Sequence, residues 1–296
     1  MQALRERLLS IFNEALHQKS PEAEVDLILL HLFRQKDRQI RNFSDLRTQN
    51  PDPDSILELE AIRIAEKRCT GIPLQHILGI QFFYEHEYKV NDSTLIPRPE
   101  TEILADAMIQ WIRLYKGNLP LRFAELGLGS GILSTEILAE FKSASGFASE
   151  VAPAAIALAR HNLERIVGAD FEKRITILEP NDPRSGFEIF ARHGKFDLIF
   201  SNPPYVSISD EIEDEVLKHE PHGALFPEVG SDSPDFFYDN FLLHFSILMS
   251  PGGSAFFEVP HERAEEILEK FKNAGIYNSK LILDLTGRPR VLQASF

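Results

Sequence analysis

The opening part of the chain spaces its apolar side chains as amphipathic helices do. Leu4 and Leu8 form one such series, and Val25 and Leu29 belong to a second. The turn-forming stretch at residues 50–54, Asn-Pro-Asp-Pro-Asp, interrupts the pattern and supplies capping residues for a further helix. Because an apolar stripe on each helix is stable only when it is buried, this part is predicted to be a small helical bundle.

Further along, the pattern becomes that of strands. Residues 82–90 alternate aromatic or β-branched with polar side chains, which predicts a connecting hairpin. Beyond it, short apolar runs alternate with longer stretches of helical spacing, which is typical of an α/β fold with a mostly parallel sheet covered on both faces. We expect strands at residues 121–126, 146–150, 174–178, 196–201, 253–258, 279–284 and 289–295, and helices at 100–115, 131–142, 153–165, 233–249 and 261–273.

These patterns predict two domains and a connection between them. A helical domain takes residues 1–80, a connecting hairpin residues 81–96, and an α/β domain residues 97–296. A chain of 296 residues, 43% of them hydrophobic, can bury a sizeable core in this arrangement.

Composition excludes several kinds of site. The single cysteine, Cys69, leaves no intramolecular disulfide framework and no cysteine-rich zinc site. The 10 histidines lack the spacing of metal ligands, so we expect no metal. Neither a signal peptide nor a run of 18 apolar residues is present, and we therefore expect a soluble cytoplasmic protein with no membrane partner.

The most informative motif is Asn202-Pro203-Pro204-Tyr205, directly after the strand predicted at residues 196–201. Two consecutive prolines can neither join a sheet ladder nor continue a helix, so the chain must leave the sheet as a stiff extended loop. Ligands bind at the carboxyl ends of strands in open α/β sheets. The amide of Asn202 could there grip the planar nitrogen of an amide or an exocyclic amine.

A glycine-rich turn follows the strand at residues 121–126. Gly127, Gly129 and Gly131 have the spacing G-x-G-x-G before a helix, which lets backbone amides approach a ligand. The spacing differs from the dinucleotide fingerprint and lacks the lysine of a P-loop, so we expect a ligand without phosphates.

Glu150 ends the next predicted strand, about 20 residues beyond the turn, where α/β nucleotide sites commonly hold ribose hydroxyls with a carboxylate. It could also be the solvated start of the following helix, which Pro153 supports. The two interpretations are compatible.

Taken together, the glycine turn, Glu150 and the Asn-Pro-Pro-Tyr loop resemble the Rossmann-like, class I methyltransferases that use S-adenosylmethionine. This resemblance implies that the turn carries the methionine and ribose end of the cofactor and that Glu150 binds the ribose. The implied cofactor-binding residues are Glu125, Gly127, Leu128, Gly129, Ser130, Gly131, Glu150, Asp182 and Asn202.

Two upstream segments, at residues 71–79 and 95–102, are similar to the HemK or PrmC family of release factor glutamine methyltransferases, as are residues 220–226 and 287–291. That family methylates the glutamine of the Gly-Gly-Gln loop in peptide-chain release factors. The resemblance runs from about residue 66 to the end of the chain. It implies a release factor as partner, a recognition role for the helical domain, and an antiparallel edge formed by the last strand.

The resemblance also implies roles within the tetrapeptide. The side-chain oxygen of Asn202 and the main-chain carbonyl of Pro203 would accept the two N–H bonds of the substrate amide. Pro203 and Pro204 would fix the loop, and Tyr205 would pack over the planar amide. Arg98 and Glu100 are possible organisers of the cofactor site.

The chain departs from the family pattern at several positions. Glu150 replaces the usual aspartate, and Leu128 stands where threonine or cysteine is common. Near the adenine, Asn181 and Asp182 are both candidates, of which we choose Asp182, with Phe187 as a possible adenine contact. Residues 258–260, Glu-Val-Pro, replace Glu-Ile-Gly.

Charge separates the possible substrates. The net charge is −14, and residues 1–90 hold 12 basic and 14 acidic side chains, against 19 and 31 in the remainder. A nucleic-acid enzyme normally needs a basic surface for phosphates, so we expect no direct nucleic-acid binding. Open alternatives are a ribosomal-protein glutamine methyltransferase, an N6-adenine methyltransferase, and a cofactor-binding module without catalysis, which would be expected to lose the tetrapeptide first. A monomer is expected.

Overall fold

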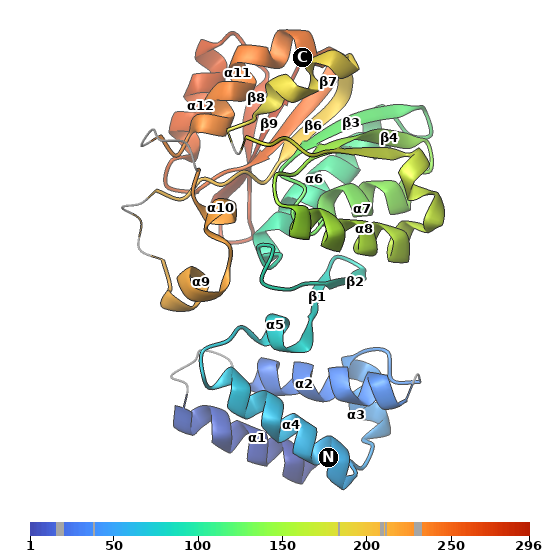
Figure 1. The fold of residues 1–296 in the computed structure, drawn as a ribbon. Helices are drawn as coiled ribbons and strands as arrows, with labels where there is room; N and C mark the ends of the chain where they lie inside the picture. The colour runs from blue at the N-terminus through green and yellow to red at the C-terminus, as the bar shows by residue number, and fades with distance from the viewer. Residues whose placement is uncertain (16–20, 38, 183, 208–209, 211, 228–232) are drawn as a thin grey trace. The chain divides into compact units, whose positions relative to one another are not determined.

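The computed structural model describes residues 1–15, 21–37, 39–182, 184–207, 210, 212–227 and 233–296. The chain divides into two compact units (Figure 1). The helical unit comprises Met1–Ile80 and Glu213–His219, and the α/β unit comprises Gln81–Ile212 and Glu220–Phe296. The sequence pattern predicts one unbroken domain from residue 97, whereas the structure groups residues 213–219 with the helical unit. No helix among the described residues is long and apolar enough to cross a membrane.

Helices of the helical unit bury a common apolar core that includes Leu8, Phe12 and Val25. They are α1 (Gln2–Ala15), α2 (Pro21–Lys36), α3 (Phe43–Gln49), α4 (Ser55–Arg68), α5 (Leu74–Leu78) and α9 (Asp214–His219). Asp54 caps α4 as the sequence predicts, because its side chain accepts a hydrogen bond from the backbone N–H of Leu57 at 2.9 Å.

Arg68 ties three of these helices together. Its guanidinium is only 4% exposed and donates to both carboxylate oxygens of Glu24 on α2, at 2.9 and 3.2 Å. It also donates to Glu215 on α9, at 3.1 Å. A buried guanidinium needs such partners, and this need explains why residues 213–219 belong with the helical unit.

A seven-stranded sheet forms the centre of the α/β unit, and a two-stranded hairpin precedes it. The hairpin strands are β1 (Ile80–Phe83) and β2 (His86–Lys89), and the sheet strands are β3 (Leu121–Leu126), β4 (Ala144–Ser149), β5 (Ile175–Leu178), β6 (Phe196–Ser201), β7 (Met249–Glu258), β8 (Ser279–Leu283) and β9 (Pro289–Ser295). Their order is β5-β4-β3-β6-β7-β9-β8. The first five run parallel, and β9 is antiparallel to both of its neighbours. The predicted α/β fold with a mostly parallel sheet is confirmed.

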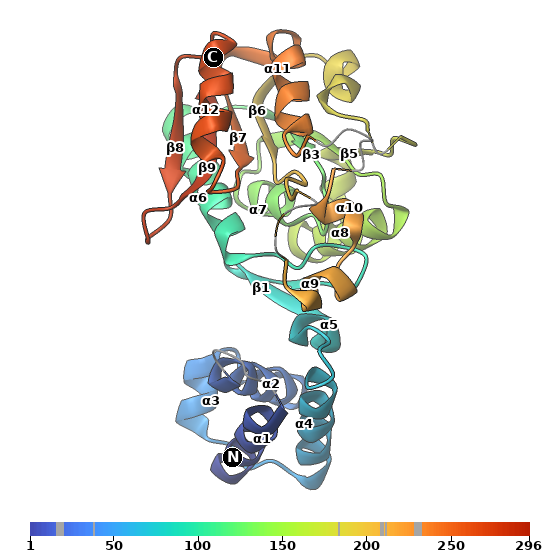
Figure 2. The same cartoon turned by 90° about the vertical axis from the view of Figure 1, so that its left-hand side faces the viewer.

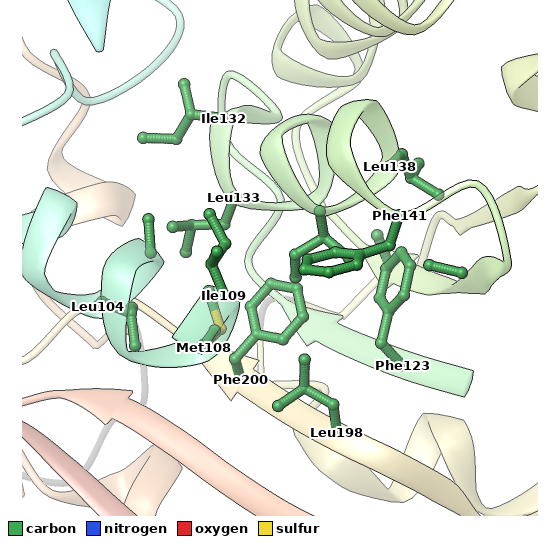
Figure 3. Close-up of a cluster of buried hydrophobic side chains, with 14 of the residues drawn as sticks. Leu104, Met108, Ile109, Phe123, Ile132, Leu133, Leu138, Phe141, Leu198 and Phe200 are labelled. Atoms are coloured by element: carbon green, nitrogen blue, oxygen red, sulfur yellow. The ribbon is translucent and has the colours of Figure 1, made fainter. Parts of the chain in front are cut away.

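Helices cover both faces of this sheet, as Figures 1 and 2 show. The main ones are α6 (Pro99–Tyr115), α7 (Ile132–Glu140) and α8 (Pro153–Val167) on one face, and α11 (Phe236–Leu248) and α12 (Ala264–Asn273) on the other. Successive residues of a strand point to opposite faces, so Phe123 packs with the first group and Ala124 with the second. In Figure 3, Phe123, Leu198 and Phe200 from the strands lie beneath the helical side chains of the first face.

Several boundaries differ from the sequence pattern. The strand expected at 253–258 starts earlier, at Met249, which pairs with Phe196, and α11 accordingly ends at Leu248. The structure also contains α10 (His222–Leu225) and two short 3-10 helices (Ala169–Lys173 and Phe187–His193). These elements are too short to show an apolar period.

Gly131 lies where α7 begins, close against α8. Its φ is 81°, in the left-handed region, and a Cβ at this position would meet Cβ of Ala159 at 3.0 Å. A glycine is therefore required here for two independent reasons, namely backbone conformation and the close approach of two helices.

Gly131→Ala should reduce the free energy of unfolding more than Gly275→Ala. Each change places alanine at a positive φ (81° and 89°) next to a helix end, which costs about 1–2 kcal/mol. At Gly275 no described atom lies within 4 Å of the new Cβ, whereas at Gly131 crowding adds about 1–3 kcal/mol. Urea unfolding followed by fluorescence of Trp111, the only tryptophan, measures the difference. Equal losses would show that the approach of α8 is unimportant.

Candidate functional site

Three strands end in register at one edge of the sheet, and a fourth ends one residue further on. Leu126 of β3 pairs with Ser149 of β4 and with Ser201 of β6, and Ser201 in turn pairs with Phe257 of β7. The next residue of each strand's chain is therefore Gly127, Glu150, Asn202 and Glu258, respectively. Parallel pairing thus brings together groups that are up to 131 residues apart in the sequence, at the edge where α/β proteins bind ligands.

A cavity of about 510 Å³ lies at this edge. Most of the residues predicted for the site line it: Glu125, Gly127, Leu128, Gly129, Ser130, Glu150, Asn202, Pro203 and Pro204. Gly131, Asp182 and Tyr205 are not among its lining residues. Among the described residues that do line it there are two carboxylates and no lysine or arginine. The cavity is therefore poorly suited to phosphates and well suited to a cation.

The glycine turn is held against the end of β4. The backbone N–H groups of Gly127 and Leu128 both donate to the carbonyl of Ser149, at 3.1 and 2.9 Å. Gly127 and Gly129 have φ of 75° and 54°, values that other residues adopt only with strain. The turn is thus fixed by the backbone, which leaves its inner surface open to a ligand.

Glu150 both closes the turn and starts α8. One of its carboxylate oxygens accepts from the N–H of Gly129 at 2.8 Å, and the other accepts from Val151 and Ala152 at 2.9 and 3.0 Å. The longer side chain of glutamate, compared with aspartate, lets it fold back onto these amides. The oxygen bound to Gly129 keeps acceptor capacity for a ligand hydroxyl, so the two roles expected of Glu150 coexist in one geometry.

Glu125 is buried at the end of β3, with 1% of its surface exposed, and it accepts a hydrogen bond from the hydroxyl of Ser134. Burial raises the pKa of Glu125 to about 8, an effect that the nearby Glu150 reinforces. This carboxyl group therefore keeps its proton to a higher pH than an exposed glutamate does, and in the protonated form it can donate as well as accept.

The tetrapeptide leaves β6 with its first and last side chains anchored. Nδ2 of Asn202 donates to the hydroxyl of Thr101 at 3.3 Å, and the hydroxyl of Tyr205 donates to Glu258 at 3.1 Å. Among the described residues nothing donates to Oδ1 of Asn202. The ring of Tyr205 is partly buried against the core around α11 and α12, and its contact with a substrate amide stays a prediction.

Near the expected adenine position, only Asn181 lines the cavity. Asp182 is exposed, and its carboxylate accepts from the N–H of Arg184 at 2.9 Å. Phe187 is fully buried and stacks edge-on against Phe241 and Phe257. The preference for Asp182 over Asn181 and the adenine contact by Phe187 are therefore not supported by the structure.

Three further polar residues were not predicted to contribute to the site. Glu220 is 5% exposed, and its carboxylate accepts from the N–H of Ile96 at 3.1 Å and pairs with Arg98. It therefore joins the two segments whose residues Pro97 and Pro221 line the cavity.

Thr94 also lines the cavity, and its buried hydroxyl has no hydrogen-bond partner among the described residues. Thr101 is the third, since it lines the cavity and its hydroxyl accepts from Asn202. Glu100, by contrast, pairs with Arg290 at 3.5 Å and does not line this cavity.

The sheet has the strand order of a class I, Rossmann-like methyltransferase. The glycine turn follows its first strand, the acid Glu150 follows the second, and Asn-Pro-Pro-Tyr follows the fourth. These features together define that class of protein.

No protein-family model matches the chain. The release factor glutamine methyltransferase of Flavobacterium psychrophilum is 31% identical over 96% of this chain and 96% of its own length. That of Corynebacterium glutamicum is 34% identical over 77% of this chain and 78% of its own. The chain belongs to the release factor glutamine methyltransferase family.

Other matches cover less of the matched protein or have lower sequence identity. A bifunctional methyltransferase of Rickettsia typhi is 29% identical over the whole chain, which spans only 58% of that protein. A protein-(glutamine-N5) methyltransferase structure from Alicyclobacillus acidocaldarius superposes with a TM-score of 0.41 at 22% identity, covering 70% of this chain and 98% of its own. The fold assignment rests on strand order and register, which do not depend on that superposition.

Stability should fall as pH rises from about 4.5 to about 8 because of Glu125. The folded protein keeps the proton up to its raised pKa of about 8, whereas the unfolded chain releases it near 4.5, so the unfolded state gains stability between these values. Glu125→Gln removes this titration, so across this range the variant should become more stable relative to the wild type by up to about 5 kcal/mol. Urea midpoints at pH 5 and pH 8.5 measure it. Parallel pH curves for the two proteins would contradict the assignment.

Proposed function

We propose that the protein transfers a methyl group from S-adenosylmethionine to the side-chain amide nitrogen of the glutamine in the Gly-Gly-Gln motif of peptide-chain release factors. The observation that carries this proposal is that Asn202 lines the cavity beside the glycine turn with an acceptor oxygen, Oδ1, to which no described residue donates. Relatives that match over most of their length are release factor glutamine methyltransferases, which supports this substrate.

The chemistry of the cavity fits the cofactor. Its walls combine apolar side chains such as Leu128 and Leu133 with Glu150 and the backbone of the glycine turn, and they include no basic side chain among the described lining residues. Glu150 would bind the ribose hydroxyls with its remaining acceptor capacity, and Asn181 would lie near the base. S-adenosylmethionine supplies, when bound, a methyl group already activated by the positive charge on sulfur.

The residues of the tetrapeptide would act on the substrate amide. An amide nitrogen is a poor nucleophile because its lone pair is delocalised into the carbonyl group. Oδ1 of Asn202 and the main-chain carbonyl of Pro203 would accept its two N–H bonds, which orients the nitrogen and favours the positive charge that builds there. The nitrogen would form a bond to the methyl carbon as the bond from that carbon to sulfur breaks, and it would lose one proton to water. Pro203 and Pro204 restrict the loop so that these acceptors stay in place.

The helical unit is proposed to recognise the protein substrate, and release factors act in the cytoplasm, where we place the enzyme. A ribosomal-protein glutamine methyltransferase would use the same amide chemistry and remains an alternative substrate assignment. N6-adenine methylation is disfavoured, because neither the cavity lining nor the charge of −14 offers the phosphate contacts that nucleic acids require.

The purified protein should methylate a release factor at the glutamine of Gly-Gly-Gln, and Asn202→Ala should lower kcat by about 10²–10³-fold, since one acceptor of the developing charge is lost. Incubation with labelled cofactor, followed by mass spectrometry of the peptide, measures both. A release factor with that glutamine changed to alanine is the control. Label appearing instead in ribosomal protein or DNA would refute the substrate, and full activity of Asn202→Ala would refute the mechanism.

Glu150→Ala should raise the dissociation constant for S-adenosylmethionine by about tenfold or more, because a charge-assisted hydrogen bond to the ribose is lost together with the anchor of Gly129. Asp182→Ala is the matched control, since Asp182 lies outside the cavity lining. Calorimetric titration gives both constants. If Asp182→Ala weakens binding and Glu150→Ala does not, the ribose site is misassigned.

A further inference from the structure

Behind the tetrapeptide lies a short chain of hydrogen bonds that ends at a buried carboxylate. Nδ2 of Asn202 donates to Oγ1 of Thr101 at 3.3 Å, and Oγ1 of Thr101 donates to Oε2 of Glu258 at 2.8 Å. Thr101 lies in the first turn of α6 and is 2% exposed, and Glu258 ends β7 and is 3% exposed. Three separate elements thus meet in one buried polar path.

The direction of each bond in this path is determined by the atoms available. An ionised carboxylate can only accept, and a hydroxyl has a single proton to donate. Once Thr101 gives that proton to Glu258, its oxygen can only accept from its other neighbour. Asn202 must therefore turn its NH₂ group toward Thr101 and its Oδ1 away from it. The opposite orientation would place two acceptors against each other in a buried position, which is costly.

The other oxygen of Glu258 holds the far end of the tetrapeptide. Oε1 accepts from the hydroxyl of Tyr205 at 3.1 Å, and the main-chain carbonyl of Glu258 accepts from Tyr238 at 2.7 Å. One carboxylate therefore positions both the first and the last residue of Asn-Pro-Pro-Tyr, the former through Thr101 and the latter directly.

We propose that Glu258 and Thr101 are positioning residues that fix the amide orientation of Asn202, so that an acceptor oxygen rather than a donor NH₂ faces the substrate. This inference rests on the proposed function, because only a substrate that presents N–H groups needs an acceptor at that point. Thr101 lines the cavity behind Asn202, and Glu258 lies outside the cavity lining. Both residues act by determining which end of the Asn202 side-chain amide, the NH₂ group or the oxygen, faces the substrate.

Protonation of Glu258 would remove this constraint. Burial raises the pKa of Glu258 to about 7, although hydrogen bonds from Thr101 and Tyr205 oppose the rise. Of the charged groups that face it, Glu100 on α6 raises the pKa further and Arg290 on β9 lowers it. Tyr238 on α11 completes the surroundings.

A protonated Glu258 can donate to Thr101, whose own proton is then free to point at Asn202. Both orientations of the Asn202 amide become satisfied, and the productive one loses its advantage. Turnover should therefore be full above about pH 7 and should decline as pH falls through that value.

The first test compares three threonine variants. Thr101→Val keeps the volume but removes the hydroxyl, and it should lower kcat by about 10–100-fold while KM for the substrate and the dissociation constant of the cofactor change less than about threefold. Thr101→Ser restores the hydroxyl and should recover most of kcat. Thr135→Val is the matched control, because the buried hydroxyl of Thr135 has no partner among the described residues. A wild-type kcat for Thr101→Val would overturn the proposal.

The second test replaces the carboxylate. In Glu258→Gln the amide oxygen would accept from Tyr205, its NH₂ group would donate to Thr101, and the Thr101 proton would turn to Oδ1 of Asn202, which reverses the amide. This variant should have a low kcat, reduced about tenfold or more, that does not vary through pH 7, where the wild type loses activity. A variant that keeps the acid limb of the wild-type profile would contradict the role of Glu258.

Neutron diffraction from crystals of the wild type and Glu258→Gln separates this inference from the proposed function, because it locates the Asn202 protons without any substrate. We expect the NH₂ group to face Thr101 in the wild type and to face the cavity in the variant. Identical orientations would overturn the positioning role even if release factor is methylated. The expected reversal, found in a protein that does not methylate release factor, would refute only the substrate.

Discussion

Parallel pairing of β4, β3, β6 and β7 is the constraint on which the site depends. The register aligns Ser149, Leu126, Ser201 and Phe257, so the residues that follow them stand in one row at the sheet edge. Gly127, Glu150, Asn202 and Glu258 are each the first residue beyond that register. A shift of one strand by a single residue would turn its side chains to the opposite face and separate the glycine turn from the tetrapeptide. Backbone geometry thus fixes the site before any side chain contributes.

The buried acids of the site are stabilised by hydroxyl groups more than by cations. Glu125 is held by Ser134, and Glu258 by Thr101 and Tyr205. Hydroxyl donors satisfy a carboxylate without bringing a fixed positive charge to the cavity wall, which a lysine or arginine would do. Hydrogen bonds from hydroxyl groups offset only part of the cost of burying a negative charge, so the pKa values of Glu125 and Glu258 stay raised. The protonation state of both groups can therefore change near neutral pH.

Local signals in the sequence predicted the backbone of the site well. Glycines that require a positive φ and prolines that cannot enter a ladder identify Gly127 and Pro203 without knowledge of the fold. Partnerships between distant residues could not be predicted in this way, because Thr101 and Glu258 are 157 positions apart and neither belongs to a recognisable motif. The choice between Asp182 and Asn181, of which only Asn181 lines the cavity, could not be made from the sequence for a different reason. Which of two adjacent side chains faces a cavity depends on the turn of the backbone, and both are equally polar.

The absence of lysine and arginine from the described cavity lining has a consequence for turnover. A negative environment attracts the charged donor over some distance and accelerates its arrival, an effect that added salt would weaken. Once the methyl group has left, the sulfur is neutral and that attraction is reduced. The electrostatic field of the cavity therefore holds the charged donor more strongly than the neutral product that it leaves behind.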